Sequence, residues 1–366
     1  MRAKKEAKKN CILLSQLILS CVLFVKPALA KSLNPHWKPQ SRFKKISKTR
    51  KESPASFSGD GWSPEITKAI NKLIADKGNA SPHYNPRKPP IATIPWEGVV
   101  TDGDIDELVF WRLIRRADFK FSDPFWNIVP IAYGRQKLRA AYEQFSPLPK
   151  TIWNTQPTYH QYLKYFVKSY QDQRLETGIK SCRIYLSRLW FGFTPQEAES
   201  YVQITLNQEK FQALKKEIIA DPPEDRAPVY IRRGIRVRPQ ALGLIQSLNN
   251  AGFDIWIISA DAEPTLKAAL SWAGISYAHP AGIKIKLDKK GIFNGKISQP
   301  LPFWGGETAT VIFHTGRIPA LSVGFWPQDQ AILSYGNGLK ILISGKDKTL
   351  VKTARKKGWL IQPAFQ

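Results

Sequence analysis

Apolar residues in the second half of the chain alternate between helical and strand-like spacing. They recur at helical intervals over residues 242–248, and Gly252 ends that helix. Residues 253–258 form a nearly continuous apolar run, which predicts a buried strand ending at Ser259, and Pro264 lies near the start of the next helix. In open α/β sheets, polar groups at the carboxyl ends of such strands bind ligands. Ser259 is therefore either an ordinary helix N-cap or a ligand-binding hydroxyl.

The same kinds of pattern predict the other elements of the fold. A short amphipathic helix is expected over residues 62–76 and a final helix over 350–356, while 308–313 is helical or extended. Short apolar runs predict strands at 91–94, 320–323 and 341–343, a last apolar run at 359–361, and a hairpin of 282–287 with 291–298. Between them the chain is mainly helical, with helices predicted at 105–116, 134–145, 158–171, 178–190, 194–206 and 208–219.

This order of elements predicts an α/β protein with a Rossmann-like, doubly wound parallel sheet. One helical block is inserted after the first strand. We expect residues 62–103 and 221–366 to form the α/β core and residues 104–220 to form an inserted helical cap. The cap is rich in aromatic residues at helical spacing, which usually indicates core packing.

The N-terminus has the pattern of a secretory signal peptide over residues 1–30. A basic stretch precedes an apolar run at 11–25, and the small residues of 28–30 form a cleavage site. The protein is therefore expected to be exported, to a periplasmic or extracellular location, and the alternative is a retained N-terminal membrane anchor. Residues 31–61 are basic and lack apolar periodicity, which predicts a disordered arm.

The formal net charge of the whole chain is +26. Such a charge attracts an anionic envelope polymer or an anionic membrane surface, and nucleic acid is the less natural target for an exported protein. The alternative is simply a well-solvated surface. Only Cys182 remains after removal of the signal peptide, so no disulfide can form within the mature chain, and this thiol is read as a small buried side chain.

The order of strand, helical insertion, strand ending in serine and later strand ending in glycine resembles the haloacid dehalogenase superfamily of phosphatases. Exported members related to phosphoserine phosphatase are the most similar branch. The resemblance covers roughly residues 89–365 and is strongest in GFDIWIISA at 252–260 and GWLIQPAF at 358–365. It implies a HAD-like core with a helical cap.

The resemblance also implies a set of catalytic groups at the carboxyl ends of the strands. In that family one aspartate attacks phosphorus, and a second, two residues later, protonates the leaving oxygen. A hydroxyl and a lysine hold the phosphoryl oxygens, while acidic residues on the last loop hold magnesium. The carboxylate can approach a dianionic phosphate only when the cations neutralise the charge between them.

This sequence departs from the family at most of those positions. Pro95 occupies the position of the nucleophile, and proline has no nucleophilic side chain. Glu307 replaces the lysine and so reverses its charge, while Glu97 keeps an acid at the second position and Ser259 keeps the hydroxyl. In the last motif only Asp329 survives. The motif positions are Pro95, Glu97, Val99, Ser259, Glu307, Phe325 and Asp329.

We therefore expect a catalytically impaired phosphatase homologue that acts as a binding module without a cofactor. Its cleft between core and cap is predicted to take an unknown small ligand, with Ser259, Glu97 and Trp326 as candidate contacts.

Two alternatives stay open. The first is an active metal-dependent phosphomonoester hydrolase in which Glu97, Asp104 and Asp329 hold magnesium. In it Asp102 or Asp104 is a displaced nucleophile, and the missing lysine is supplied by Lys284, Lys286 or Lys296. The second, compatible with the binding module, is attachment to an anionic envelope surface through the basic arm.

Overall fold

The computed structural model describes residues 56–219, 228–303, 305–345 and 347–365. The expected signal peptide, its cleavage site and most of the basic arm lie outside these residues. Within them, no helix combines the length and apolarity needed to cross a bilayer.

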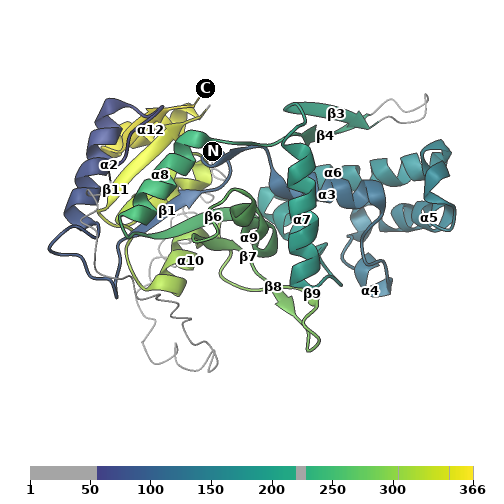
Figure 1. Ribbon diagram of the computed structural model, residues 1–366. Coiled ribbons are helices and arrows are strands. Elements are labelled where there is room, and N and C mark those ends of the chain that lie inside the picture. The colour runs from purple at the N-terminus through teal and green to yellow at the C-terminus, as the bar shows by residue number, and fades with distance from the viewer. Residues whose placement is uncertain (1–55, 220–227, 304, 346, 366) are drawn as a thin grey trace, which may run out of the picture. The chain divides into compact units, whose positions relative to one another are not determined.

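A six-stranded parallel sheet forms the centre of the α/β core (Figure 1). Every neighbouring pair of strands is parallel, which confirms the predicted sheet. In sheet order its strands are β12 (Leu360–Pro363), β11 (Leu339–Ser344), β10 (Leu321–Gly324), β1 (Ile91–Pro95), β6 (Asp254–Ala262) and β7 (His279–Ile283).

Both faces of the sheet are covered, as the continuous apolar runs of its central strands require. Ile94 and Ile257 point to one face and belong to the large cluster that includes helix α8. Ile91 and Ile258 point to the opposite face and pack with Val311 of helix α10. The core helices are α2 (Pro64–Lys77), α8 (Pro239–Asn250), α9 (Glu263–Trp272), α10 (Gly306–Thr315), α11 (Gln330–Ser334) and α12 (Lys348–Lys357).

The inserted cap packs around aromatic side chains, so the interpretation of its aromatic stripes as core is confirmed. Phe145, Tyr162 and Phe166 are fully buried, and their rings meet edge to face. The cap contains α3 (Ile105–Arg116), α4 (Asp123–Trp126), η2 (Ile131–Tyr133), α5 (Arg135–Phe145), η3 (Lys150–Thr155), α6 (Pro157–Arg188) and α7 (Pro195–Glu209).

Two short strands lie where the chain enters and leaves the cap. The strand β2 (Thr101–Asp102) pairs antiparallel with β5 (Arg236–Val237). The two connections between core and cap are therefore held side by side by backbone hydrogen bonds.

Part of the cap differs from the prediction. The helix expected over 208–219 is wrong, because α7 ends at Glu209 and the strand β3 (Lys215–Ile219) follows. This strand pairs antiparallel with β4 (Val229–Arg233), so pairing with a distant segment overrode the local helical pattern. The helices expected at 158–171 and 178–190 run together as α6, with non-helical backbone at Gly178.

Other boundaries also move. The strand β7 was not predicted, whereas the hairpin of β8 (Ile285–Leu287) and β9 (Phe293–Ile297) is confirmed. Phe57 is buried against Trp62, and its backbone exchanges two hydrogen bonds with the Asn71 side chain. The ordered fold thus begins at Phe57 at the latest, before the expected end of the arm at Gly61.

Candidate functional site

The carboxyl ends of β1, β6 and β10 meet around one small cavity of about 30 Å³. Five of the seven motif positions line it, and so does Trp326. The sequence prediction that these side chains converge at one edge of the sheet is therefore right. The five are Pro95, Glu97, Ser259, Glu307 and Asp329.

The other two motif positions take part in packing. Val99 is fully buried and does not line the cavity. The Phe325 ring packs against Trp326 and lies over Gly98, which has φ +79°. A Cβ on Gly98 would lie 2.3 Å from Phe325 Cδ1, so only glycine fits this turn.

Pro95, which the sequence resemblance aligns with the nucleophile of that family, has no reactive side chain. Pro95 is buried at the end of β1, and Trp96, the next residue, donates its N–H to the Ile258 carbonyl at 2.8 Å. The backbone is thus fixed between its neighbours in the sheet.

Ser259 joins two carboxyl groups. Its Oγ lies 2.8 Å from Glu97 Oε1 and 2.8 Å from Asp261 Oδ2, and it accepts the Asp261 N–H at 2.9 Å. A hydroxyl has a single proton, so it can donate to only one carboxylate. Burial, and then the charge of Glu97, raise the pKa of Asp261 well above its usual range.

The N-cap interpretation of Ser259 is wrong, because β6 continues to Ala262. That residue is the N-cap of α9 and makes no side-chain capping bond. The strand shifts register against β7 between Ile258 and Ala262, and Ser259, which lines the cavity, lies in this irregular part.

Glu307 and Asp329 form a second carboxyl pair. Asp329 accepts the backbone N–H groups of Phe325 at 2.7 Å and Trp326 at 2.9 Å, and it is almost fully buried. Burial raises the pKa of Asp329 to about 6, against these hydrogen bonds and one with Glu307, which lower it. Burial and the nearby Asp329 charge raise the pKa of Glu307 well above its usual range. The two carboxyl groups therefore share a proton near neutral pH.

The cavity has no cation to hold a phosphoryl group. No Lys, Arg or His stands among the described residues that line it. The lysines proposed as substitutes lie elsewhere: Lys284 contacts His314 and pairs with Glu263 at 3.6 Å, while Lys286 and Lys296 are exposed on the β8–β9 hairpin. That part of the hydrolase alternative is wrong.

The predicted metal-binding trio is not assembled either. Asp104 caps α3 by accepting the Glu107 N–H at 2.9 Å, and it pairs with Arg183. Asp102 is exposed, 3.9 Å from Arg238. Across the described parts of the chain, no group of three or more His, Cys, Asp or Glu side chains is placed to bind a metal ion. Asp329 Oδ2 already accepts two N–H groups, and its neighbour Glu307 is held neutral, so this donor set does not fit magnesium.

A buried ion network joins cap and core beside the cavity. Arg183 of α6 contacts Asp261 at 2.8 Å and both oxygens of Asp104, one of them at 3.0 Å. Burial alone would raise the pKa of Asp104, but the charge and hydrogen bonds of Arg183 hold it below the usual value. Asp106 Oδ2 accepts the Ala262 N–H at 3.1 Å, and burial followed by the Asp261 charge raises its pKa well above the usual range.

Sequence reasoning missed three members of this network. Asp261 stands two residues after Ser259, so the strand-end argument could have included it. Arg183 and Asp106 are brought in by helices of the cap, and no spacing in the sequence points to them.

The fold is shared with a solved structure of a functionally unknown protein from Anaerococcus prevotii. That structure has 21% sequence identity and a TM-score of 0.70, covering 81% of this chain and 90% of its own. Together with the parallel sheet, the inserted cap and the converging motif positions, this likeness decides the fold.

The chain has an α/β fold with a parallel sheet and an inserted cap, which is the architecture that the resemblance to the haloacid dehalogenase superfamily implies. More distant structural neighbours include a HAD family hydrolase from Salmonella enterica serovar Typhi, with 10% identity, 72% of this chain and 64% of that chain covered, and a TM-score of 0.39. Another is a phosphoserine phosphatase, with 10% identity, coverage of 75% and 92%, and a TM-score of 0.35. No protein-family model matches this chain, and neither does any curated protein sequence.

Proposed function

We propose that this is an exported, catalytically impaired HAD-like protein that acts by binding. The observation that supports this most directly concerns two residues of the strand-end cavity, which differ in charge from the catalytic aspartate and lysine of the family. Pro95 and Glu307 both line this cavity. The sequence resemblance aligns them with the family's nucleophile and lysine, respectively.

The electrostatics of the cavity oppose phosphate binding. A phosphomonoester dianion placed there would meet Glu97, Glu307 and Asp329 without a cation among the described lining residues. Two like charges about 4 Å apart repel by about 4 kcal/mol at an effective dielectric constant of about 20. Even one ionised carboxylate therefore offsets a large part of any binding free energy.

The size of the cavity argues in the same direction. A volume of about 30 Å³ holds a guest of the size of a water molecule, whereas ligand pockets are usually about 300–1,000 Å³. The small ligand expected against Ser259, Glu97 and Trp326 does not fit this cavity if it is larger than a water molecule. We therefore propose that the ligand is bound elsewhere on the molecule.

Phosphatase assays test the loss of chemistry. The full-length chain is expressed in a host that exports it, so that the N-terminus is processed as it would be natively. It is then assayed against a panel of phosphomonoesters with magnesium or with chelator. We expect no turnover above the blank in either condition. Magnesium-dependent turnover that is lost in Glu97→Gln or Ser259→Ala would show that the cavity is an active site and would refute the proposal.

The same preparation tests export. The pattern of residues 1–30 leads us to expect a mature N-terminus at Lys31, determined by N-terminal sequencing of the exported protein. An intact start at Met1, found in the membrane fraction, would instead support a retained anchor.

The basic arm, which was expected over residues 31–61 but ends before Phe57, supports a second role that is compatible with the first. We propose that it attaches the folded part to an anionic envelope polymer or membrane surface. Deleting residues 31–55 should abolish salt-sensitive retention on anionic vesicles. Unchanged retention would assign the attraction to the folded part instead.

A further inference from the structure

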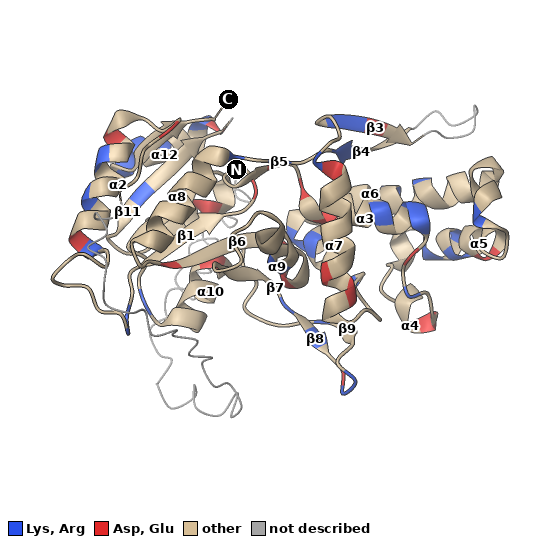
Figure 2. Cartoon of the chain, viewed as in Figure 1, with Lys and Arg blue, Asp and Glu red and all other residues tan. Residues whose placement is uncertain are grey.

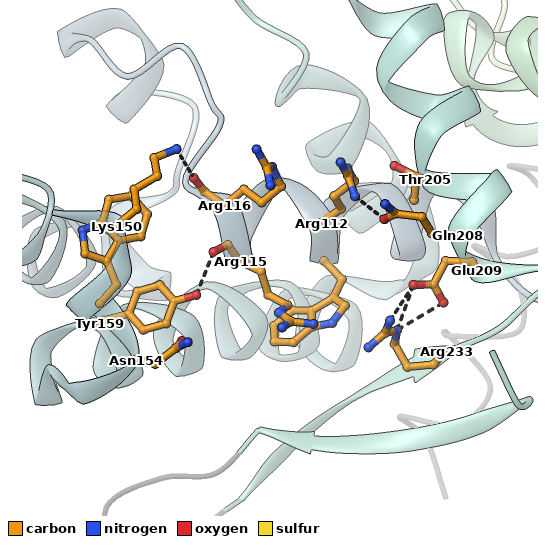
Figure 3. Close-up of a pocket in the computed structure, with 12 residues that line it drawn as sticks. Arg112, Arg115, Arg116, Lys150, Asn154, Tyr159, Thr205, Gln208, Glu209 and Arg233 are labelled. Carbon is orange, nitrogen blue, oxygen red and sulfur yellow. Dashed lines mark hydrogen bonds and ion pairs between the residues drawn. The ribbon is translucent and has the colours of Figure 1, made fainter. Parts of the chain in front are cut away.

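The cap contains a much larger cleft, far along α3 from the strand-end cavity. Its volume is about 410 Å³, within the range of small-molecule sites. The C-terminal half of α3 forms its floor, with η3 and Tyr159 at one end and α7 with β4 at the other (Figure 3). Figure 2 shows basic residues on the β3–β4 hairpin and on the adjoining cap helices.

The lining of this cleft is strongly basic. Among the described residues it has one carboxylate, Glu209, and five cationic side chains. Glu209 is buried and already bound, by Arg233 at 2.6 Å and by the Gly234 N–H at 2.9 Å. The five cations are Arg112, Arg115, Arg116, Lys150 and Arg233.

The other cations are only partly neutralised by neighbouring acids. Arg116 and Lys150 share Asp118, at 2.6 and 3.6 Å. Neither Arg112 nor Arg115 forms an ion pair with any described carboxylate. Arg115 is exposed and lies over the Trp111 ring at 5.7 Å, so its guanidinium is held in position while its charge stays available.

Aromatic side chains form fixed walls around these charges. The Tyr159 hydroxyl donates to the Arg115 carbonyl at 2.7 Å, and Trp153 Nε1 donates to the Leu148 carbonyl at 2.9 Å. Lys150 lies 5.2 Å from the centre of the Trp153 ring. Flat rings next to a guanidinium plane are suited to stacking a planar group.

Two buried donors at the cleft have no acceptor. Trp111 Nε1 and Arg112 Nε are buried N–H groups that find no partner in the described chain. Leaving a buried donor unsatisfied costs about 1–3 kcal/mol. An oxygen-rich anion in the cleft would accept from the exposed Arg115 guanidinium, because arginine presents its N–H groups in a fork that matches phosphate oxygens.

We propose that this cleft binds a small phosphate-bearing molecule with a flat ring. The phosphate oxygens are held by the arginines of α3, and the ring stacks on the aromatic walls. The proposal deepens the binding function proposed above and rests on it, and it places the ligand in the cap instead of the strand-end cavity.

Adenosine monophosphate is a suitable probe, with inorganic phosphate and adenosine as its two halves. Binding to the full-length protein is followed by calorimetry and by quenching of tryptophan fluorescence, since Trp111 and Trp153 line the cleft. We expect saturable binding of the monophosphate, at least ten-fold tighter than that of either half.

Arg115→Glu and a matched control locate the site. Arg115 and Arg87 are both exposed, and Arg87 lies in the loop before β1, outside the cleft. Arg115→Glu should weaken binding of the monophosphate at least ten-fold, Arg115→Lys less, and Arg87→Glu not measurably. Equal losses of affinity in Arg115→Glu and Arg87→Glu would refute binding in the cleft and would show that the general positive charge of the protein attracts the monophosphate.

Other outcomes also overturn the inference. No binding of the monophosphate at millimolar concentration would remove the cleft as a site and leave the phosphatase result unaffected. Binding of inorganic phosphate as tight as that of the monophosphate would refute the stacked ring, and equally tight adenosine would refute the phosphate contact. Conversely, turnover in the phosphatase assay would refute the proposed loss of chemistry, while binding in the cleft could still be measured separately.

Discussion

The protonation of Asp329 makes a sharp prediction about stability and pH. Asp329→Asn removes the charge while leaving a side-chain oxygen that can still accept the N–H groups of Phe325 and Trp326. The variant isolates the ionisation of one buried carboxyl group, because the capping geometry of the loop after β10 is kept.

The magnitude follows from the raised pKa. In the unfolded chain an aspartate ionises near pH 4, whereas burial raises the pKa of Asp329 to about 6 in the fold. Between these values the folded protein holds a proton that the unfolded chain releases, so the free energy of unfolding falls as pH rises. The loss is complete above about pH 6 and amounts to about 3 kcal/mol. Glu307, whose pKa is also raised, acts in the same direction.

Urea unfolding at pH 4.5, 6 and 8 measures this effect. Part of the loss has already occurred at pH 4.5, so we expect Asp329→Asn to gain about 2 kcal/mol relative to the wild type between the lowest and the highest pH. Asp76→Asn, an exposed site on α2, is the matched control and should follow the wild type. Parallel curves for the wild type and Asp329→Asn would mean that Asp329 is ionised in the fold, and the account of a proton-sharing pair would then be refuted.

Two further substitutions test other parts of the site by urea unfolding. Arg183→Met leaves Asp104 buried without its cation and should lower the free energy of unfolding by about 3–5 kcal/mol. Arg188→Met, at an exposed position of the same helix, is the control and should lower it by less than about 1 kcal/mol. Similar losses in both variants would show that the ion network of Arg183 does not contribute specially to stability. Gly98→Ala combines a positive φ with a clash against Phe325. It should lower the free energy of unfolding by about 1–3 kcal/mol more than Gly291→Ala, where φ is +77° and no atom lies within 4 Å of the new Cβ. Equal losses would show that the Phe325 ring moves aside freely.

The sequence predicted the sheet well because its central strands are buried on both sides. Residues 253–258 and 91–94 are almost continuously apolar, and this pattern leaves few alternatives to a parallel core strand. The strand β7 was not predicted because His279 and Pro280 interrupt its apolar pattern. The hairpin of β3 and β4 was not predicted because its pairing is set by contacts between segments distant in sequence.

The candidate site was predicted in part for a similar reason. Strand ends of a parallel sheet lie at one edge, so the convergence of Glu97, Ser259 and Asp329 follows from the strands alone. The pairing of Glu307 with Asp329 depends on how α10 packs, and the enclosure of the cavity depends on side chains around it. Neither is encoded in spacing along the chain.

The basic cleft could not be predicted from the sequence for a different reason. Its arginines on α3 are three and four residues apart, which is also the spacing of an ordinary solvated helix face. Only the packing of η3, α7 and β4 around that face turns it into a concave site.

The substitutions in the strand-end cavity depend on one another. A lysine at position 307 would keep Asp329 ionised, whereas the glutamate found there needs a neighbouring group with which to share a proton, and Asp329 supplies it. A carboxylate at position 95 would add another negative charge beside Glu97 and Asp261, where the proline adds none. Pro95 and Glu307 therefore favour the same arrangement, one that needs no bound cation. Restoring one family residue alone would break this balance without rebuilding a phosphate site.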